Sequence, residues 1–171
     1  MKNALLAPAP VISKGGDALI VIFQIGRQLY GLPLPFVLEI VRLPALVSLA
    51  GAPPTLCGLL NLRGQYLPIM DGCTLVGAPS LYDLNSQIVI AGRNKPELGL
   101  LVDQVRDVCA VATSRIAPID RRDVAAFLTN VFDWDDGSVL LFDLTALLAL
   151  RPSKSKLKSK NSTRSREPRT D

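Results

Sequence analysis

The chain has 171 residues, of which 49% are hydrophobic and only 5% aromatic, and its formal net charge is +4. A chain of this length can bury one substantial, mainly aliphatic core without needing disulfides or metal ions. It contains no histidine, which removes the commonest general base and the usual metal ligand, excludes phosphorylation of this chain on histidine, and makes catalysis an unfavourable interpretation.

The positive charge is concentrated at the C-terminal end. Residues 151–171 hold eight Lys/Arg and two Asp/Glu, whereas residues 1–150 hold eleven Lys/Arg against thirteen Asp/Glu. Because residues 151–171 have almost no apolar side chains to bury, we expect a disordered basic tail. It would serve as a solubilising tail or as a tether to anionic lipid, nucleic acid or an acidic partner. Residues 1–16 are expected to be a flexible segment and residues 17–150 the folded domain.

Neither a membrane-spanning helix nor a signal peptide is predicted. No stretch reaches 18 uninterrupted apolar residues, and prolines interrupt the N-terminal apolar run over residues 4–12. The three cysteines, Cys57, Cys73 and Cys109, are odd in number and widely spaced, which argues against a disulfide framework. We therefore expect a cytoplasmic protein whose cysteines are small core residues.

The first half of the chain alternates short apolar runs with turn signals. Its predicted strands cover residues 19–25, 46–49 and 66–70, with turns at residues 26–28 and 52–54. Pro35 is well placed as the first residue of a short helix through Val41, since its missing donor costs little there. Further on, an Arg63-Gly64 turn leads into a strand that ends at Asp71. This aspartate is predicted to cap a helix over residues 73–76, which Gly77 ends.

The second half repeats this arrangement. Its predicted strands cover residues 87–91, 98–102 and 139–142, with turns at residues 92–96 and 136–138. Asp143 then precedes the apolar run 144–150, as Asp71 precedes its helix. The acidic pairs of this half, Asp120 with Asp123 and Asp135 with Asp136, lie in polar, turn-like stretches that are typical of solvated loops.

Comparing the chain with itself indicates a duplication. A shift of 68 positions places Ile20-Val21-Ile22 on Ile88-Val89-Ile90, Gly31 on Gly99, Val37 on Val105 and Glu39 on Asp107. We predict two related units, about 18–83 and 86–150, and allow for exchange of strands between them. Many short, regularly punctuated strands favour a mainly all-β fold of small barrels or a sandwich over a doubly wound α/β sheet, with α+β as the alternative.

Several motifs carry a family resemblance. They are the run Gly58-Leu59-Leu60-Asn61-Leu62-Arg63-Gly64, then Leu67-Pro68-Ile69 and Asp71, with Tyr30-Gly31-Leu32-Pro33 before them and Gly99-Leu100-Leu101-Val102-Asp103 after them. Over residues 17–150 the chain resembles the CheW-like family, the adaptors that couple chemoreceptors to the histidine kinase CheA. The resemblance implies two five-stranded SH3-like β-barrels packed side by side, with short helices.

The chain also departs from the family pattern. Gly72-Cys73 follows Asp71 where the family commonly has Leu-Arg, so the contacts of that second arginine are absent here. Residues 113–133 carry no family signature, and Phe132-Asp133-Trp134 replaces the usual small residues before the last hairpin. A partner choice that differs from that of a housekeeping chemotaxis adaptor is therefore left open, as is a swimming or a pilus-driven output.

The resemblance implies a noncatalytic adaptor that needs no cofactor, metal or small-molecule substrate. Its expected partners are the regulatory domain of a CheA-type kinase and the cytoplasmic tip of chemoreceptors, so it would reach the membrane only through receptor arrays. Arg63 is the principal expected contact, because a guanidinium on a rigid turn can bind a carboxylate in bidentate fashion. Glu39 lies among apolar neighbours and is expected at a wet edge or beside a partner cation. The expected partner-binding residues are Arg63, Glu39, Val37, Ile40, Gly58, Asn61, Gly64, Gly99 and Val105.

The sequence leaves two other classes of function open. A nucleic-acid-binding barrel protein that uses the basic tail is the main alternative, although few aromatic residues and a slightly negative folded part make it unlike a cationic stacking groove. An enzyme with an unfamiliar site would have to use Asp135 or Asp136. Both are less well supported than the adaptor.

Overall fold

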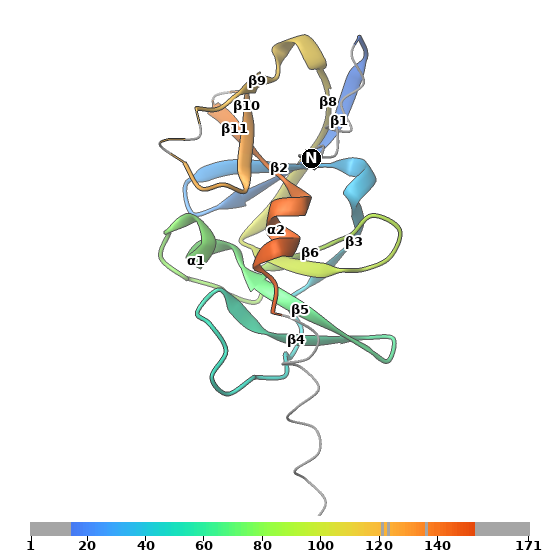
Figure 1. Ribbon diagram of the computed structural model, residues 1–171, viewed down its shortest axis with the longest axis vertical. Helices are drawn as coiled ribbons and strands as arrows, with labels where there is room; N and C mark the ends of the chain where they lie inside the picture. Colours follow the sequence, from blue (N-terminus) through green and yellow to red (C-terminus); the bar gives the residue numbers. More distant parts are fainter. Residues whose placement is uncertain (1–14, 121, 123, 136, 153–171) are drawn as a thin grey trace, which may run out of the picture.

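A computed structural model describes residues 15–120, 122, 124–135 and 137–152. Over these residues the chain is mainly β and forms two sheets. Figure 1 shows the sheets as an upper and a lower lobe, with the second helix lying between them. Except for residues 15–16 and 151–152, the predicted flexible N-terminal segment and basic tail lie outside the described residues.

The upper sheet has six strands in the order β8-β1-β2-β11-β10-β9. Neighbouring strands are antiparallel except β2 and β11, which run parallel. We refer to this sheet and its interior as the six-stranded barrel. Its strands are β1 (Asp17–Ile25), β2 (Gln28–Pro33), β8 (Gln104–Ala112), β9 (Ala117–Pro118), β10 (Leu128–Trp134) and β11 (Gly137–Phe142).

The lower sheet, the five-stranded barrel, has the order β3-β6-β7-β5-β4. Here β5 and β7 are the parallel pair. A single bridge between Val47 and Leu59 joins the segment after β3 to β4, which brings the two edges of the sheet together. Its strands are β3 (Val37–Arg42), β4 (Leu56–Leu62), β5 (Gln65–Asp71), β6 (Gln87–Ala91) and β7 (Leu98–Val102).

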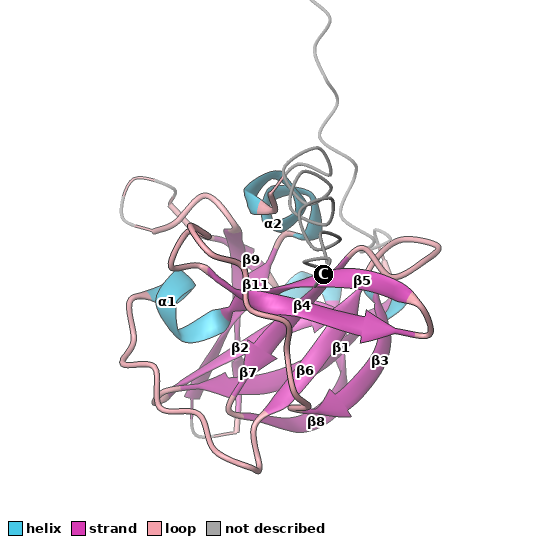
Figure 2. Ribbon diagram, turned by 90° about the horizontal axis from the view of Figure 1, so that it is seen from below, coloured by secondary structure: helices cyan, strands magenta, loops and turns pink. Residues whose placement is uncertain are grey.

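Two short α-helices, drawn in cyan in Figure 2, follow equivalent strands. Both aspartate caps are confirmed. Asp71 accepts a hydrogen bond from the Thr74 backbone N–H at 3.1 Å and begins α1 (Gly72–Val76). Gly77, with a φ of 72°, ends it. Asp143 likewise accepts from the Ala146 N–H at 3.1 Å and begins α2 (Leu144–Leu150). In each case the carboxylate satisfies an otherwise unpaired donor of the first turn.

Two predicted elements of the first half are wrong. The helix expected from Pro35 to Val41 is a 3-10 turn over Leu34–Phe36, followed directly by β3. Consecutive residues of β3 alternate between half-buried and exposed, as in an edge strand with one face packed. Its β-branched residues favour a strand, and pairing with β6 outweighs the helix start that Pro35 indicated. The strand expected over residues 46–49 is only the bridge at Val47.

The duplication in the sequence recurs in the strand registers. Glu39 of β3 pairs with Ile90, and Asp107 of β8 pairs with Ile22, which lies 68 positions before Ile90. A bulge interrupts both ladders at the equivalent place. Each sheet combines the first two strands of one half of the chain with the last three main strands of the other half. Neither sheet can therefore form from one half alone.

The core consists of three clusters. One fills each barrel, and equivalent isoleucines dominate both: Ile20 and Ile22 in the six-stranded barrel, Ile88 and Ile90 in the other. The third, which we call the central cluster, lies between the sheets and includes Leu144 and Leu147 of α2. Three aromatic rings surround Phe142 there, with centroid distances of 5.3 Å to Tyr30, 5.4 Å to Phe127 and 5.9 Å to Phe23. This shared core holds the barrels side by side.

Candidate functional site

The β4–β5 hairpin holds Arg63 in an unusual backbone conformation. The loop has two residues, and both have positive φ, 51° at Arg63 and 85° at Gly64. Such turns match the twist of paired strands, but their first position usually carries Asn, Asp or Gly. The Asn61 side chain accepts a hydrogen bond from the Gly64 N–H at 2.9 Å, which fixes the turn. A non-glycine residue in this region costs roughly 1 kcal/mol, so the arginine is held in place despite an unfavourable local preference.

Arg63 pairs with Glu39, the other charged residue predicted for this surface. The distance from Arg63 Nη2 to Glu39 Oε2 is 3.1 Å, and the two side chains are 73% and 35% exposed. A pair this exposed contributes about 0–1 kcal/mol to stability, because water and salt screen it. The guanidinium is thus oriented by Glu39 and still presented to solvent.

Exposed apolar side chains lie close in sequence to this pair, in β3 and in the β4–β5 hairpin. Leu38 and Ile40, which are 40% and 38% exposed, lie on the outer face of β3, opposite the face that carries the half-buried Glu39. Tyr66 follows Arg63 by three residues, pairs with Asn61 across the hairpin and is 50% exposed. We name the surface formed by Leu38, Glu39, Ile40, Arg63 and Tyr66 the hairpin surface. It contains an oriented ion pair and, on the other face of β3 and in β5, exposed apolar side chains.

Three of the predicted residues lie in one row across the five-stranded sheet. Glu39 pairs with Ile90, Ile90 with Gly99, Gly99 with Ile69, and Ile69 with Gly58. Both glycines are buried. A Cβ at Gly58 would lie 2.7 Å from the Val47 carbonyl oxygen, and one at Gly99 would lie 2.7 Å from Ile88 Cγ2. These glycines therefore shape the barrel beneath the hairpin surface.

Val37 and Val105 lie apart from the hairpin, at the junction of the barrels. Both are half-buried against the central cluster. Val105 belongs to β8 of the six-stranded barrel, and its N–H donates to the Gln87 side-chain oxygen at 2.7 Å. The structure thus brings Glu39, Asn61, Arg63 and Gly64 together at the β4–β5 hairpin. It leaves Ile40 on the other face of β3 and Val105 with the other barrel.

Sequence reasoning missed Leu38 and Tyr66. The spacing of Leu38 and Ile40, two residues apart with Glu39 between them, indicates one face of a strand. That signal was concealed by the helix expected from Pro35. Tyr66 was placed in a strand, and its exposure depends on the end of the hairpin extending beyond the barrel.

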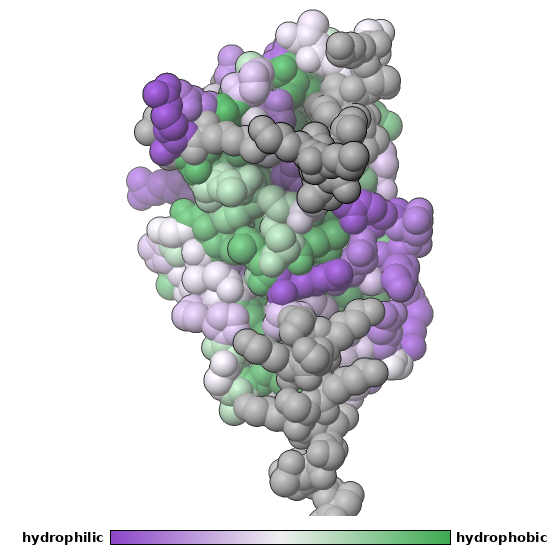
Figure 3. Space-filling model, viewed as in Figure 1, coloured by the Kyte–Doolittle hydropathy of each residue, from purple (hydrophilic) through white to green (hydrophobic). Residues whose placement is uncertain are grey.

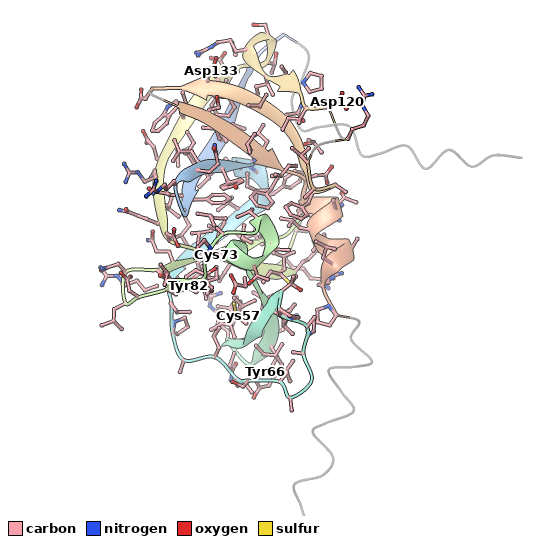
Figure 4. All side chains as sticks on the ribbon, turned by 90° about the vertical axis from the view of Figure 1, so that its left-hand side faces the viewer. Cys57, Tyr66, Cys73, Tyr82, Asp120 and Asp133 are labelled. Atoms are coloured by element: carbon pink, nitrogen blue, oxygen red, sulfur yellow. The ribbon has the colours of Figure 1, made fainter. Side chains whose placement is uncertain are left out.

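A buried polar network lies close to the start of α1. Asp71 is 8% exposed and accepts hydrogen bonds from the Tyr82 hydroxyl, from Ser80 Oγ at 3.1 Å and from the Thr74 N–H. Burial alone would raise the pKa of Asp71, but these hydrogen bonds outweigh it and lower the pKa. Figure 4 shows Tyr82 beside Cys73 in the middle of the molecule, with Tyr66 at the lower end. The network joins the loop after α1 to the helix cap and is structural.

Cys73 is buried, whereas Cys57 and Cys109 are half-buried and pack against the cores of the five-stranded and the six-stranded barrel. Burial, and then the neighbouring Asp71 carboxylate, raise the pKa of Cys57 to about 12, and burial also raises the pKa of Cys73 and Cys109. A thiol held protonated is a poor nucleophile. Within the described residues, no cluster of three or more His, Cys, Asp or Glu could hold a metal ion. No helix in the described part of the chain is long and apolar enough to cross a bilayer.

Comparison with known proteins gives a consistent result. A model of the CheW-like domain matches residues 19–151. The chain is 27% identical over 132 residues to chemotaxis protein CheW from Klebsiella aerogenes, covering 75% of this chain and 80% of that protein. It is 29% identical over 138 residues to a probable chemotaxis protein CheW from Rhizobium etli, covering 78% and 89% of the two chains.

The solved structures agree. The crystal structure of the scaffolding protein TtCheW from Thermoanaerobacter tengcongensis superposes with a TM-score of 0.69 at 27% identity, covering 75% of this chain and 85% of that one. The predicted mainly β fold of two SH3-like barrels is thereby confirmed. This chain belongs to the CheW-like family and is a noncatalytic scaffold protein of the chemotaxis type.

Proposed function

We propose that this protein couples chemoreceptors to a CheA-type histidine kinase by binding both, and that the hairpin surface is its principal contact. The observation that carries the proposal is a mostly exposed arginine, held in a strained turn and oriented by Glu39, with exposed apolar side chains on the same two elements. In a scaffold protein, strain of this kind is explained if Arg63 is needed for recognition, because a Gly or Asn would form the turn more readily.

The geometry suits protein recognition. Glu39 restricts the rotamers of Arg63, so less side-chain entropy is lost when a partner carboxylate accepts the remaining guanidinium donors. Leu38, Ile40 and Tyr66 offer apolar area whose removal from water favours association by about 25 cal/mol per Å². A charged anchor with an apolar surround is typical of an interface hot spot.

The family resemblance supports the division of partners. A homologous barrel of the kinase's regulatory domain would dock on the five-stranded barrel, and the cytoplasmic tip of a receptor would bind an apolar groove of the scaffold. The protein would then be held in receptor arrays at the cytoplasmic side of the membrane. Val37 and Val105 at the barrel junction are proposed to contribute to these contacts, and Gly58 and Gly99 to contribute through the shape of the barrel.

The test is a binding measurement with the purified full chain, a CheA-type regulatory domain and a receptor cytoplasmic fragment. We expect Arg63→Ala or Glu39→Ala to weaken binding to at least one partner by tenfold or more, equivalent to about 1.4 kcal/mol. Arg27→Ala is the matched control, because Arg27 is an exposed arginine on the two-residue β1–β2 turn. Native affinity of both the Arg63 and the Glu39 variant for both partners would remove the hairpin surface from the proposal.

A further inference from the structure

A polar cleft, which we name the junction cleft, lies where the two sheets meet. Its volume is about 490 Å³, within the range that is usual for ligand pockets. β1 and β8 of the six-stranded barrel contribute to its lining, together with β3 and β6 of the five-stranded barrel and the loop between α1 and β6. Figure 3 shows apolar surface in the middle of one face, where α2 lies in Figure 1. The junction cleft is different, because amides and charged groups make up most of its lining.

Two half-buried glutamines of the cleft have oriented side-chain amides. Gln24 Nε2 donates to the Gly26 carbonyl oxygen at 2.7 Å, which leaves Gln24 Oε1 as an acceptor. Gln87 Oε1 accepts from the Val105 N–H at 2.7 Å, which leaves Gln87 Nε2 as a donor. Neither remaining amide atom has a partner in the part of the chain that the structure describes. A peptide main chain carries one donor and one acceptor per residue, so this fixed acceptor and donor match it.

Arg42 adds a positive charge to the same cleft. It lies directly opposite Gln87 in the β3–β6 ladder, so the two side chains share one face of the sheet. Arg42 is exposed, and its guanidinium forms no ion pair or hydrogen bond with any described residue. All its donors are therefore available to a ligand, and a carboxylate is the group that a guanidinium binds in bidentate fashion.

Two carboxylates of the cleft limit how much negative charge a ligand can carry. Asp103 Oδ2 accepts from the Gly26 N–H at 2.6 Å, and Asp83 Oδ1 accepts from the Asn85 N–H at 2.7 Å. Neither aspartate forms an ion pair with another described residue. Like charges repel, so these aspartates oppose a run of acidic residues, whereas a single carboxylate beside Arg42 is compatible with them.

An apolar side chain is held at the edge of the cleft. Leu81 lines the cleft and is 82% exposed. The next residue, Tyr82, donates its hydroxyl hydrogen to the buried Asp71. In the same loop, Ser86 Oγ accepts from the Asp83 N–H at 3.0 Å. The loop is thus anchored on both sides of the cleft lining, and Leu81 offers apolar area whose removal from water would favour binding.

We propose that the junction cleft binds an extended peptide segment that carries a single acidic residue. Gln24 and Gln87 would bind its main chain, Arg42 its carboxylate, and Leu81 an apolar side chain beside it. A small carboxylate alone would use Arg42 and leave the two oriented amides unmatched. The junction cleft shares no residue with the hairpin surface, so this inference and the proposed function can fail separately.

The experiment is an NMR titration of the ¹⁵N-labelled full chain with the capped pentapeptide Ala-Leu-Glu-Ala-Ala. The comparison ligands are the same peptide with Gln in place of Glu, and free glutamate. We expect saturable shifts of the Gln24 and Gln87 side-chain amide signals. The Glu peptide should bind about tenfold more tightly than the Gln peptide, because only its carboxylate forms charge-assisted hydrogen bonds with Arg42.

Three variants test the assigned roles. Arg42→Gln should weaken binding of the Glu peptide about tenfold, to the level of the Gln peptide. Arg115→Gln removes the same charge from the exposed 3-10 turn after β8, outside the cleft, and should change the affinity less than about twofold because solvent screens that charge. Gln87→Glu keeps an oxygen for the Val105 N–H but replaces the remaining donor by an acceptor, and should weaken both peptides about fivefold.

Three results would overturn the proposal. They are equal affinities for the Glu and Gln peptides, equal effects of Arg42→Gln and Arg115→Gln, and binding of free glutamate as tight as that of the Glu peptide. The first two would remove Arg42 from the site. The third would mean that the cleft recognises a carboxylate without a peptide main chain.

Discussion

At the residue scale, different physical constraints favour glycine at positions 58 and 64. Gly58 combines a φ of 154° with a backbone oxygen where its Cβ would lie, whereas Gly64 has a φ of 85° and open space around it. Only the first is restricted by both conformation and contact. The family motif contains both residues and does not distinguish these causes.

We therefore expect Gly58→Ala to lower the free energy of unfolding more than Gly64→Ala does. The second change costs about 1 kcal/mol for the left-handed backbone alone, and the first adds the displacement of the segment at Val47, for about 2–3 kcal/mol in total. Urea unfolding of both variants measures this order. Equal free energies of unfolding would mean that the segment at Val47 moves away from a Cβ at position 58 without loss of stability.

The sequence predicted Arg63 and Glu39 individually but not their pairing. Arg63 was identified from the hairpin motif, and Glu39 from its place among apolar neighbours. Their contact depends on the barrel bringing the β4–β5 hairpin to β3, although the two residues are 24 positions apart in the sequence. A local pattern does not contain that information.

At the element scale, the capping aspartates were predictable because a cap is a local signal. Asp71 and Asp143 each stand at the boundary between a strand and a helix, and their acceptors serve a donor three residues later. The β3 strand was not predictable in the same way. Pro35 lies in a 3-10 turn, as its local preference indicates. The residues after it form a strand instead of a helix because they pair with β6.

The Asp71 network predicts an acid-dependent stability. Since the folded-state pKa of Asp71 lies below its unfolded value, the ionised carboxylate stabilises the fold above about pH 4 and that contribution is lost as pH falls through the folded pKa. Asp71→Asn should lower the free energy of unfolding by about 1–3 kcal/mol at pH 7. The difference in the free energy of unfolding between the native chain and Asp71→Asn, measured with urea, should be smaller at about pH 3. A deficit that stays constant between these pH values would contradict this role of the charge.

At the scale of the whole molecule, the exchange of strands should make the two barrels unfold together. Each sheet needs strands from both halves of the chain, and the central cluster joins the sheets. The duplication itself was readable from matched residues such as Gly31 and Gly99. Which half supplies which strand of a sheet was not, because strand partners are chosen by long-range packing.

Trp134, the one tryptophan of the chain, allows this to be measured. It lies in β10 of the six-stranded barrel, whereas Ile88 is in the core of the other barrel. Ile88→Ala should cost about 2–5 kcal/mol and should shift the Trp134 fluorescence transition as far as the equivalent change Ile20→Ala does. A Trp134 transition that Ile88→Ala leaves in place would show that the barrels unfold independently.

The central claim is that Arg63 serves partner recognition although an arginine is unfavourable at this position of the turn. The most direct measurement is the affinity of Arg63→Asn for the kinase regulatory domain and the receptor fragment, alongside its urea unfolding. Because Asn suits the left-handed turn, stability should remain within about 1 kcal/mol of the native value or rise, while binding to at least one partner falls tenfold or more. Native binding by a stably folded Arg63→Asn chain would contradict the account.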